Sequence, residues 1–258
     1  MLPPNALPTS QPSLRRLIGR YPSSESGREG QHGFPAGAAS SWRSSALFLG
    51  HAEDGLPVLL DIRTPVRGPI LVAADAGAGK TRLLQVLARG IELAHDPTRV
   101  RYAVVTTHVA EWSAFEHSLH CDGILSFHNA VTTGYLHSAA LCRPPSLAPS
   151  HPLVLLIDGL EALASDADLR GASYALLHSP RPPGVFPFVT LDTSSASIPA
   201  AWLDVFDICV RGYVRKPQGL ARWVGLDAEA PGDLQPPRQF AARCDGRSWL
   251  PFWLPELA

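Results

Sequence analysis

A short stretch of small residues limits the possible folds of this chain more than any other feature. The apolar segment Pro69–Ala73, PILVA, runs directly into ADAGAGKT at Ala74–Thr81. A helix is predicted next, from about Lys80 to His95, because apolar residues recur there at helical spacing. A strand, a small-residue turn and a helix in this order bring main-chain N–H groups together on an anion, and the helix adds its positive end. The segment therefore predicts a phosphate-binding loop.

The loop follows the pattern GxxxxGK with Ser or Thr next, except that Ala74 stands at the first glycine. An alanine is compatible with that position if its φ is negative. Lys80 is expected to reach the β- and γ-phosphates of ATP, and the Thr81 hydroxyl to ligate Mg²⁺. The residues predicted to hold the nucleotide are Asp75, Ala76, Gly77, Ala78, Gly79, Lys80, Thr81 and Arg82.

A second acid follows the most apolar stretch of the chain, where Leu153–Ile157 ends at Asp158. We expect Asp158 to hold Mg²⁺, directly or through water, on a strand next to that of the loop. Hydrolysis also needs a group that orients the attacking water. Many ATPases carry Glu directly after this Asp, but here Gly159 stands there and Glu161 is the nearest carboxylate. Glu161 either orients the water or only favours the N-terminus of its helix.

Polar residues also follow the predicted strand Phe186–Leu191, which ends in Asp192-Thr193-Ser194-Ser195. If this strand lies beside Leu153–Ile157, these residues face the γ-phosphate. Thr193 would then sense the phosphate or position water. The alternative is that Asp and Ser side chains here only cap a loop.

The remaining pattern alternates between strand-like and helix-like segments. Strands are predicted at Ala46–Leu49, Pro57–Ile62, Val100–Thr106, Gly123–Ser126 and Phe206–Val214, and Asp54-Gly55 marks a hairpin. Helices are predicted at Val109–Leu119, Asn129–Leu141, Leu160–Leu177 and Pro217–Leu226. Such alternation predicts an α/β fold with a mainly parallel central sheet and helices on both of its faces.

The chain divides by composition into a tail and a domain. Residues 1–43 are rich in Pro, Ser and Gly, which bury too little apolar surface to offset the entropy of ordering, so this tail is predicted to be disordered. Residues 44–258 are predicted to form a single domain. Its C-terminal β extension is a strand–turn–strand at Phe240–Leu254.

Charge and cysteine usage exclude several classes of protein. With 22 Lys and Arg against 23 Asp and Glu, the net charge of −1 lacks the basic excess of a stand-alone DNA-binding domain. DNA-binding through a local patch or the lumen of a ring stays open. The four cysteines are far apart, so we expect reduced thiols and no metal knot. No signal peptide or membrane span is predicted, which favours a cytoplasmic protein.

The segment Leu47–Thr81, LFLGHAEDGLPVLLDIRTPVRGPILVAADAGAGKT, resembles the entry to the motor domain of the FtsK/SpoIIIE DNA translocases, which are FtsK/HerA-type ATPases. That family has a short strand ending in Gly, a Gly-Pro-like hairpin, an Asp and a strand leading into the phosphate loop. The matching residues here are Gly50, Gly55, Pro57 and Asp61. The resemblance extends over about residues 46–215 and includes LLID at Leu155–Asp158.

This resemblance implies a RecA-like fold, ATP hydrolysis, a ring-shaped homo-oligomer and translocation of double-stranded DNA or a protein. It also implies that Arg211 could complete the site of a neighbouring subunit, although a surface arginine is the favoured alternative. The sequence departs from the family at Ala74, at Gly159 and at Thr193, which stands where the family carries Gln.

Three functions fit these features. The first is an ATPase acting on DNA or a partner protein. The second, favoured by Ala74 and Gly159, is a nucleotide-binding regulatory or scaffold subunit whose turnover has decayed. The third is a nucleotide or metabolite kinase, for which Arg181, Arg215 and Lys216 are the available residues for an arginine-rich lid.

Overall fold

The computed structural model describes residues 46–61, 68–141, 152–178, 184–194, 198–206, 208–215, 231, 233–244 and 248–257. The predicted tail at 1–43, the predicted helix Pro217–Leu226 and the turn at Asp245-Gly246 lie outside these residues. Within the described residues, no helix is long and apolar enough to cross a membrane.

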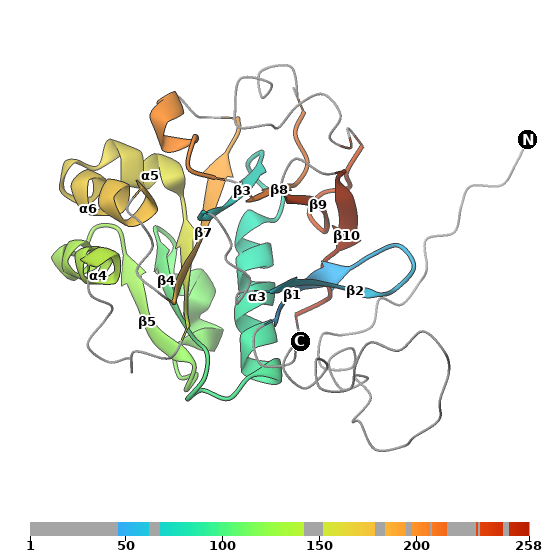
Figure 1. The fold of residues 1–258 in the computed structure, drawn as a ribbon, viewed down its shortest axis with the longest axis horizontal. Helices are drawn as coiled ribbons and strands as arrows, with labels where there is room; N and C mark the ends of the chain where they lie inside the picture. Colours follow the sequence, from blue (N-terminus) through green and yellow to red (C-terminus); the bar gives the residue numbers. More distant parts are fainter. Residues whose placement is uncertain are drawn as a thin grey trace, which may run out of the picture.

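The described strands form one ten-stranded sheet with the order β2-β1-β10-β9-β8-β3-β7-β6-β4-β5 (Figure 1). Its strands are β1 Ala46–His51, β2 Pro57–Asp61, β3 Ile70–Ala74, β4 Arg101–Thr106, β5 Cys121–Ser126, β6 Leu153–Asp158, β7 Val185–Asp192, β8 Ile208–Arg211, β9 Gln239–Cys244 and β10 Leu250–Trp253. The strands from β8 to β5 pair in parallel, which confirms the predicted α/β fold with a mainly parallel central sheet.

One predicted neighbour relationship is wrong. We expected the strand that ends in Asp158 to lie beside the strand of the phosphate loop. Instead β7 lies between β3 and β6 and pairs in parallel with both. The polar end of β7 therefore sits between the two motifs, and Asp192 is in register with Ala74. Periodicity cannot predict this order, because each of these strands is predominantly apolar and mostly buried.

The other four strands extend the sheet in antiparallel fashion. The predicted hairpin is confirmed, since β1 and β2 pair from Ala46↔Asp61 to His51↔Pro57. The two predicted C-terminal strands are also confirmed as β9 and β10, and β9 continues the sheet beyond β8. Both ends of the described chain thus lie on the same side of β3.

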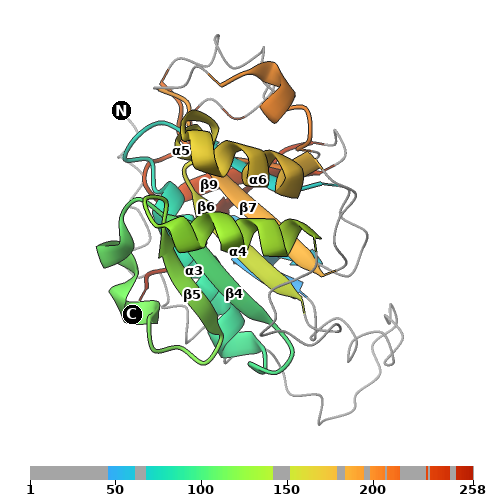
Figure 2. The same ribbon diagram turned by 90° about the vertical axis from the view of Figure 1, so that its left-hand side faces the viewer.

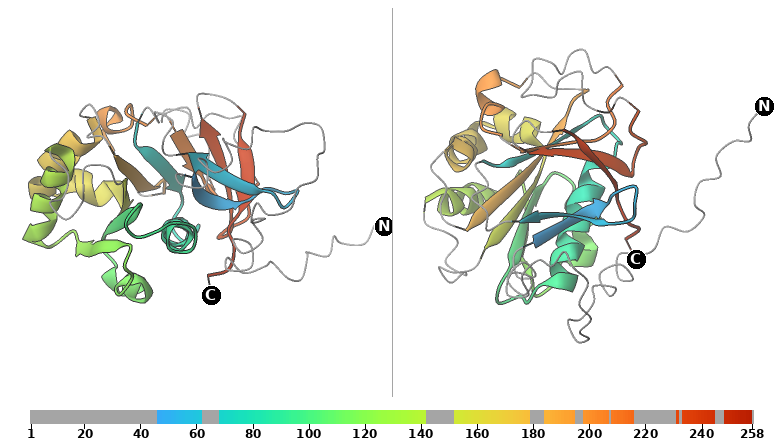
Figure 3. Two further views of the ribbon diagram at one scale, coloured as in Figure 1. Left: turned by 60° about the horizontal axis from the view of Figure 1, so that its bottom comes forward. Right: turned by 45° about the vertical axis from the view of Figure 1, so that its right-hand side comes forward.

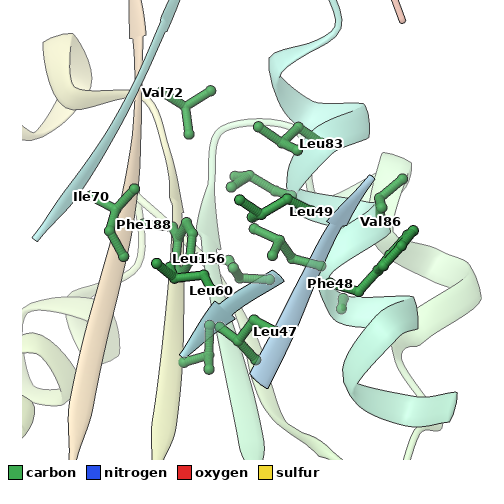
Figure 4. Close-up of a cluster of buried hydrophobic side chains, with 14 of the residues drawn as sticks. Leu47, Phe48, Leu49, Leu60, Ile70, Val72, Leu83, Val86, Leu156 and Phe188 are labelled. Atoms are coloured by element: carbon green, nitrogen blue, oxygen red, sulfur yellow. The ribbon is translucent and has the colours of Figure 1, made fainter. Parts of the chain in front are cut away.

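Helices cover both faces of the sheet (Figures 2 and 3). On one face lies α3, Lys80–Ala94, whose buried leucines, together with Val86 and Ile91, pack against β1, β3 and β6 (Figure 4). The other face carries α4 Ala130–Leu141, α5 Leu160–Ser165 and α6 Ala167–His178, together with the short η2 turn at Ala200–Trp202. Each face has its own apolar core, so the sheet is fully buried near β3, β7 and β6.

Two predicted helices have a different form. Val109–Phe115 is a 3-10 helix, η1, in which Trp112 and Phe115 are buried three residues apart. That spacing aligns side chains along one edge of a 3-10 helix. The predicted helix Leu160–Leu177 is divided at Asp166, whose carboxylate accepts hydrogen bonds from the N–H groups of Asp168 and Leu169 and so begins α6.

Candidate functional site

The loop between β3 and α3 turns through two glycines with left-handed backbone, Gly77 with φ 73° and Gly79 with φ 92°. A side chain would be strained at either position, so these two residues are glycine for a conformational reason. Ala74 is the last residue of β3 and is fully buried. Its place in a regular strand explains why an alanine replaces the first glycine of the motif.

Lys80 lies at the start of α3 and folds back over its own loop. Its Nζ donates hydrogen bonds to the carbonyl oxygens of Ala74, at 3.0 Å, and of Asp75, at 2.9 Å. Burial lowers the pKa of the Lys80 amine, and four carboxylates around it oppose that shift: Asp192, Glu161, Asp158 and Asp75. The amine therefore lies in a cluster of acids that come from the phosphate loop, β6, α5 and β7.

Thr81 and Asp158, the two predicted metal ligands, are in direct contact. The Thr81 hydroxyl donates a hydrogen bond of 2.7 Å to Asp158 Oδ2, across 77 residues of sequence. The second carboxylate oxygen, Oδ1, accepts a 2.8 Å bond from the hydroxyl of Thr190 on β7. The intervening strand thus supplies the group that orients Asp158. Thr190 was not singled out from the sequence, although a polar residue within an otherwise apolar strand is a signal that could have found it.

Glu161 lies in the first turn of α5, where it reaches the end of β7. Its Oε2 accepts a 3.5 Å bond from the N–H of Asp192. Burial raises the pKa of Glu161; hydrogen bonds from backbone N–H groups and the charge of Lys80 oppose that rise, and the charge of Asp192 adds to it. Gly159, at the position expected for Glu, has φ 132° and begins α5. That backbone disfavours any side chain, so a Glu at this position would be strained.

Thr193 and Asp75 are joined by a hydrogen bond of 2.5 Å from the Thr193 hydroxyl to Asp75 Oδ1. Asp75 Oδ2 accepts a 2.8 Å bond from the backbone N–H of Arg215. The N–H of Thr193 donates to the carbonyl oxygen of Ala74 at 3.1 Å. The side chain of Asp75, predicted only as a loop residue, therefore ties the phosphate loop to the chain after β7 and after β8.

Arg211 was predicted either to complete the site of a neighbouring subunit or to lie on the surface, and its position differs from both. It is the last residue of β8 and only 1% exposed, so it is not a surface arginine. It lies opposite Ala73 on β3 and Ala241 on β9, in the interior of its own sheet. In this structure the guanidinium is not presented to a neighbouring subunit.

The C-terminal part of the chain contacts the phosphate loop. A Cβ built on Gly79 would overlap the carbonyl oxygen of Pro237 and lie 3.0 Å from its carbonyl carbon. Arg82, one turn into α3, donates a 3.5 Å bond to the carbonyl oxygen of Pro255. No motif in the sequence marks these contacts, because they join residues more than 150 positions apart.

The oxygens of Thr81 and Asp158 fit Mg²⁺, which prefers hard oxygen ligands and completes its shell with phosphates and water. Among the described side chains, no group of three or more His, Cys, Asp and Glu could hold a metal by itself. A cavity of about 740 Å³ opens beside Asp158 and Glu161, and Pro199 and Trp202 line its other end. Solvent therefore has access to the Glu161 side of the site.

No protein-family model matches this chain, and no curated protein matches it. Solved structures are similar in fold. The cytoplasmic domain of the type VII secretion ATPase EccC from Thermomonospora curvata has a TM-score of 0.63 at 20% identity, over 87% of this chain and 27% of that one. The pCW3 conjugation coupling protein TcpA, in its monomer form with ATPγS, has a TM-score of 0.62 at 12% identity, over 81% and 65%.

The genome packaging NTPase B204 of Sulfolobus turreted icosahedral virus 2, in complex with AMPPCP, has a TM-score of 0.54 at 13% identity, over 74% of this chain and 100% of that one. This chain spans less than half the length of the secretion ATPase structures that it resembles. These similarities show a RecA-like α/β fold.

Proposed function

We propose that this protein is a Mg²⁺-dependent ATPase of the FtsK/HerA type that binds ATP at Asp75–Arg82 and acts on DNA or on a partner protein. The observation that carries the proposal is the 2.7 Å contact between Thr81 and Asp158, with the Lys80 amine in the same group of acids. A loop that only turned the chain would not need these three side chains together.

The groups at the site have distinct roles in this proposal. Main-chain N–H groups of the loop and the first turn of α3 bind the phosphates. Lys80 exchanges its carbonyl partners for phosphate oxygens and offsets their charge. Thr81 and Asp158 hold Mg²⁺, which when bound neutralises charge on the transferred phosphoryl group.

Glu161 is the group that orients the attacking water and takes its proton, and Thr193 helps to position that water. Two observations support this assignment: Glu161 shares the electrostatic surroundings of Lys80, and a solvent cavity reaches its side chain. A base works best when its pKa approaches the working pH, and burial raises the pKa of Glu161 in that direction.

The fold comparison supports a proposal about the cargo and the assembly. The similar structures are a secretion ATPase, a conjugation coupling protein and a genome packaging NTPase. We propose that this chain forms a homo-oligomer and moves double-stranded DNA or a protein in the cytoplasm. Because its net charge is −1, contact with DNA would require assembly to gather local basic groups.

The test is phosphate release from ATP and Mg²⁺, with and without double-stranded DNA, with oligomer size measured in the same samples. The expected result is turnover by the wild type that Lys80→Ala abolishes together with ATP binding. Binding of ATP with no phosphate release in any condition would contradict the ATPase.

That outcome would favour the second candidate, a nucleotide-binding regulatory or scaffold subunit. Two observations favour it: Gly159 occupies the position expected for the catalytic Glu, and the Lys80 amine is bound by the carbonyls of its own loop. Transfer of phosphate to a small acceptor would instead indicate a kinase.

A further inference from the structure

The triphosphate in the proposed site has a defined direction. Its γ end lies near Thr81, Asp158 and Glu161, which belong to the side of β3 occupied by β7 and β6. Because the nucleoside is bonded to the α-phosphate, at the other end of the linear triphosphate, we expect it on the opposite side of the loop. That side is occupied by β8, β9 and β10 (Figure 1).

The segment that leads into β9 lies against the loop on this side. Pro237 packs so closely on Gly79 that a Cβ there would overlap its carbonyl oxygen. The turn that contains Pro237 is held by backbone bonds from the N–H groups of Arg238 and Gln239 to the carbonyl of Gln235, at 3.2 and 2.8 Å. The turn is therefore held by its own backbone bonds, and Pro237 packs directly on the phosphate loop at Gly79.

Two charged side chains stand next to this turn. Arg238 Nη1 lies 2.9 Å from Glu256 Oε1, and the two side chains are 36% and 53% exposed. The N–H of Leu254 donates to the carbonyl oxygen of Arg238 at 2.8 Å, which joins the turn to the last described residues. Burial lowers the pKa of Arg82, in the first turn of α3; the charge of Arg238 lowers it further, and the charge of Glu256 opposes this shift. An accessible guanidinium and carboxylate therefore lie where the phosphate loop ends.

We propose that Pro237, Arg238 and Glu256 form the nucleoside subsite of this protein. The flat guanidinium of Arg238 provides a surface on which a purine base stacks. The carboxylate of Glu256 only accepts hydrogen bonds, and ribose hydroxyls supply the matching donors. This inference rests on the proposed ATP site and adds to it a binding surface from the C-terminal β extension.

The test compares the dissociation constants of ATP and inorganic tripolyphosphate, each with Mg²⁺, for the wild type, Arg238→Ala and Glu256→Ala. Tripolyphosphate carries the phosphate chain without the nucleoside. We expect each variant to bind ATP about tenfold more weakly than the wild type and to bind tripolyphosphate as the wild type does. A matched control is Arg89→Ala. It breaks a different arginine–glutamate pair, between Arg89 and Glu92 on α3 at 2.7 Å, and should change neither dissociation constant.

Other outcomes separate the two proposals. If Arg238→Ala weakens the binding of both ligands and Glu256→Ala strengthens it, these residues act only through charge. The proposed nucleoside subsite is then wrong. Equal binding of ATP and tripolyphosphate by the wild type also overturns the subsite and leaves the phosphate site intact. If the wild type binds neither ligand, the proposed function itself fails.

Discussion

The Thr193 hydroxyl donates a 2.5 Å hydrogen bond to Asp75, so a residue after β7 is held by a carboxylate of the phosphate loop. A hydroxyl has one proton and two lone pairs. With its proton directed to Asp75, Thr193 presents lone pairs to the site. It is thus arranged to accept a hydrogen bond from the attacking water, and donation to a γ-phosphate would require the bond to Asp75 to break.

This relationship predicts the effect of Thr193→Val. The variant keeps the shape of the side chain and loses the acceptor, so we expect kcat to fall about 10- to 100-fold while the Kd for ATP stays within about threefold. Thr193→Ser retains the hydroxyl and is the control. Steady-state turnover and equilibrium binding check the prediction, and an undiminished kcat in Thr193→Val would contradict it.

Asp75→Asn should lower kcat through Thr193, because Thr193 donates to Oδ1 and the N–H of Arg215 donates to Oδ2, and in Asn an NH2 group replaces one of these two acceptors. Removal of a negative charge beside the triphosphate should leave ATP binding equal or tighter. The double variant with Thr193→Val is expected to be no slower than Thr193→Val alone, since both changes break one interaction. Additive losses of kcat would show that Asp75 acts by another route.

The contact between Thr81 and Asp158 predicts how turnover depends on Mg²⁺. In Asp158→Asn one charged oxygen is lost, so the Mg²⁺ concentration for half-maximal turnover should rise about tenfold or more. Thr81→Ser keeps the hydroxyl and should behave as the wild type. Turnover measured against Mg²⁺ concentration at saturating ATP tests this prediction. An unchanged midpoint in Asp158→Asn would show that Asp158 does not bind the metal.

The pH dependence of turnover should follow Glu161. Its base role requires the carboxylate, and its pKa is raised above the ordinary value, mainly by burial. Turnover is therefore present above the raised pKa and is lost as the pH falls through it. Glu161→Gln should lower kcat about 100-fold or more and remove this limb of the profile.

The stability of the same variant provides the control. Because folding raises the pKa of Glu161, the stabilisation linked to this group is present at low pH and lost as the pH rises through the folded pKa. Glu161→Gln should accordingly leave the free energy of unfolding at pH 7 unchanged or higher. A large destabilisation would mean that the lost turnover reflects unfolding.

Gly79 and Gly55 offer a matched pair for the contact with the C-terminal segment. Both have a left-handed φ, 92° and 81°, but only Gly79 has backbone where a Cβ would lie. Gly55→Ala should cost about 1–2 kcal/mol of unfolding free energy from strain alone. Gly79→Ala should cost about 1–3 kcal/mol more because it adds a steric overlap. Urea unfolding measures the free energy of unfolding of both variants. Equal losses would show that the segment around Pro237 shifts to accommodate the added methyl group at little cost.

Local patterns were enough to predict the individual elements. The Ala74–Thr81 loop, the helix after it, the hairpin at Asp54-Gly55 and the acid at Asp158 are each encoded within a few residues, by backbone geometry and hydrophobic period. The same applies to β9 and β10, which were expected as a strand–turn–strand. In such segments, neighbours in the sequence are also neighbours in space.

The arrangement between these elements was decided by the tertiary structure alone. Placement of β7 between β3 and β6, the role of Thr190, the burial of Arg211 and the packing of Pro237 on Gly79 all depend on which apolar strand lies beside which. Buried parallel strands present similar apolar surfaces, so the sequence of each one is compatible with several neighbours. Only packing of the whole sheet and its helices selects one order, and that order brings Thr81, Asp158, Glu161 and Thr193 to one edge.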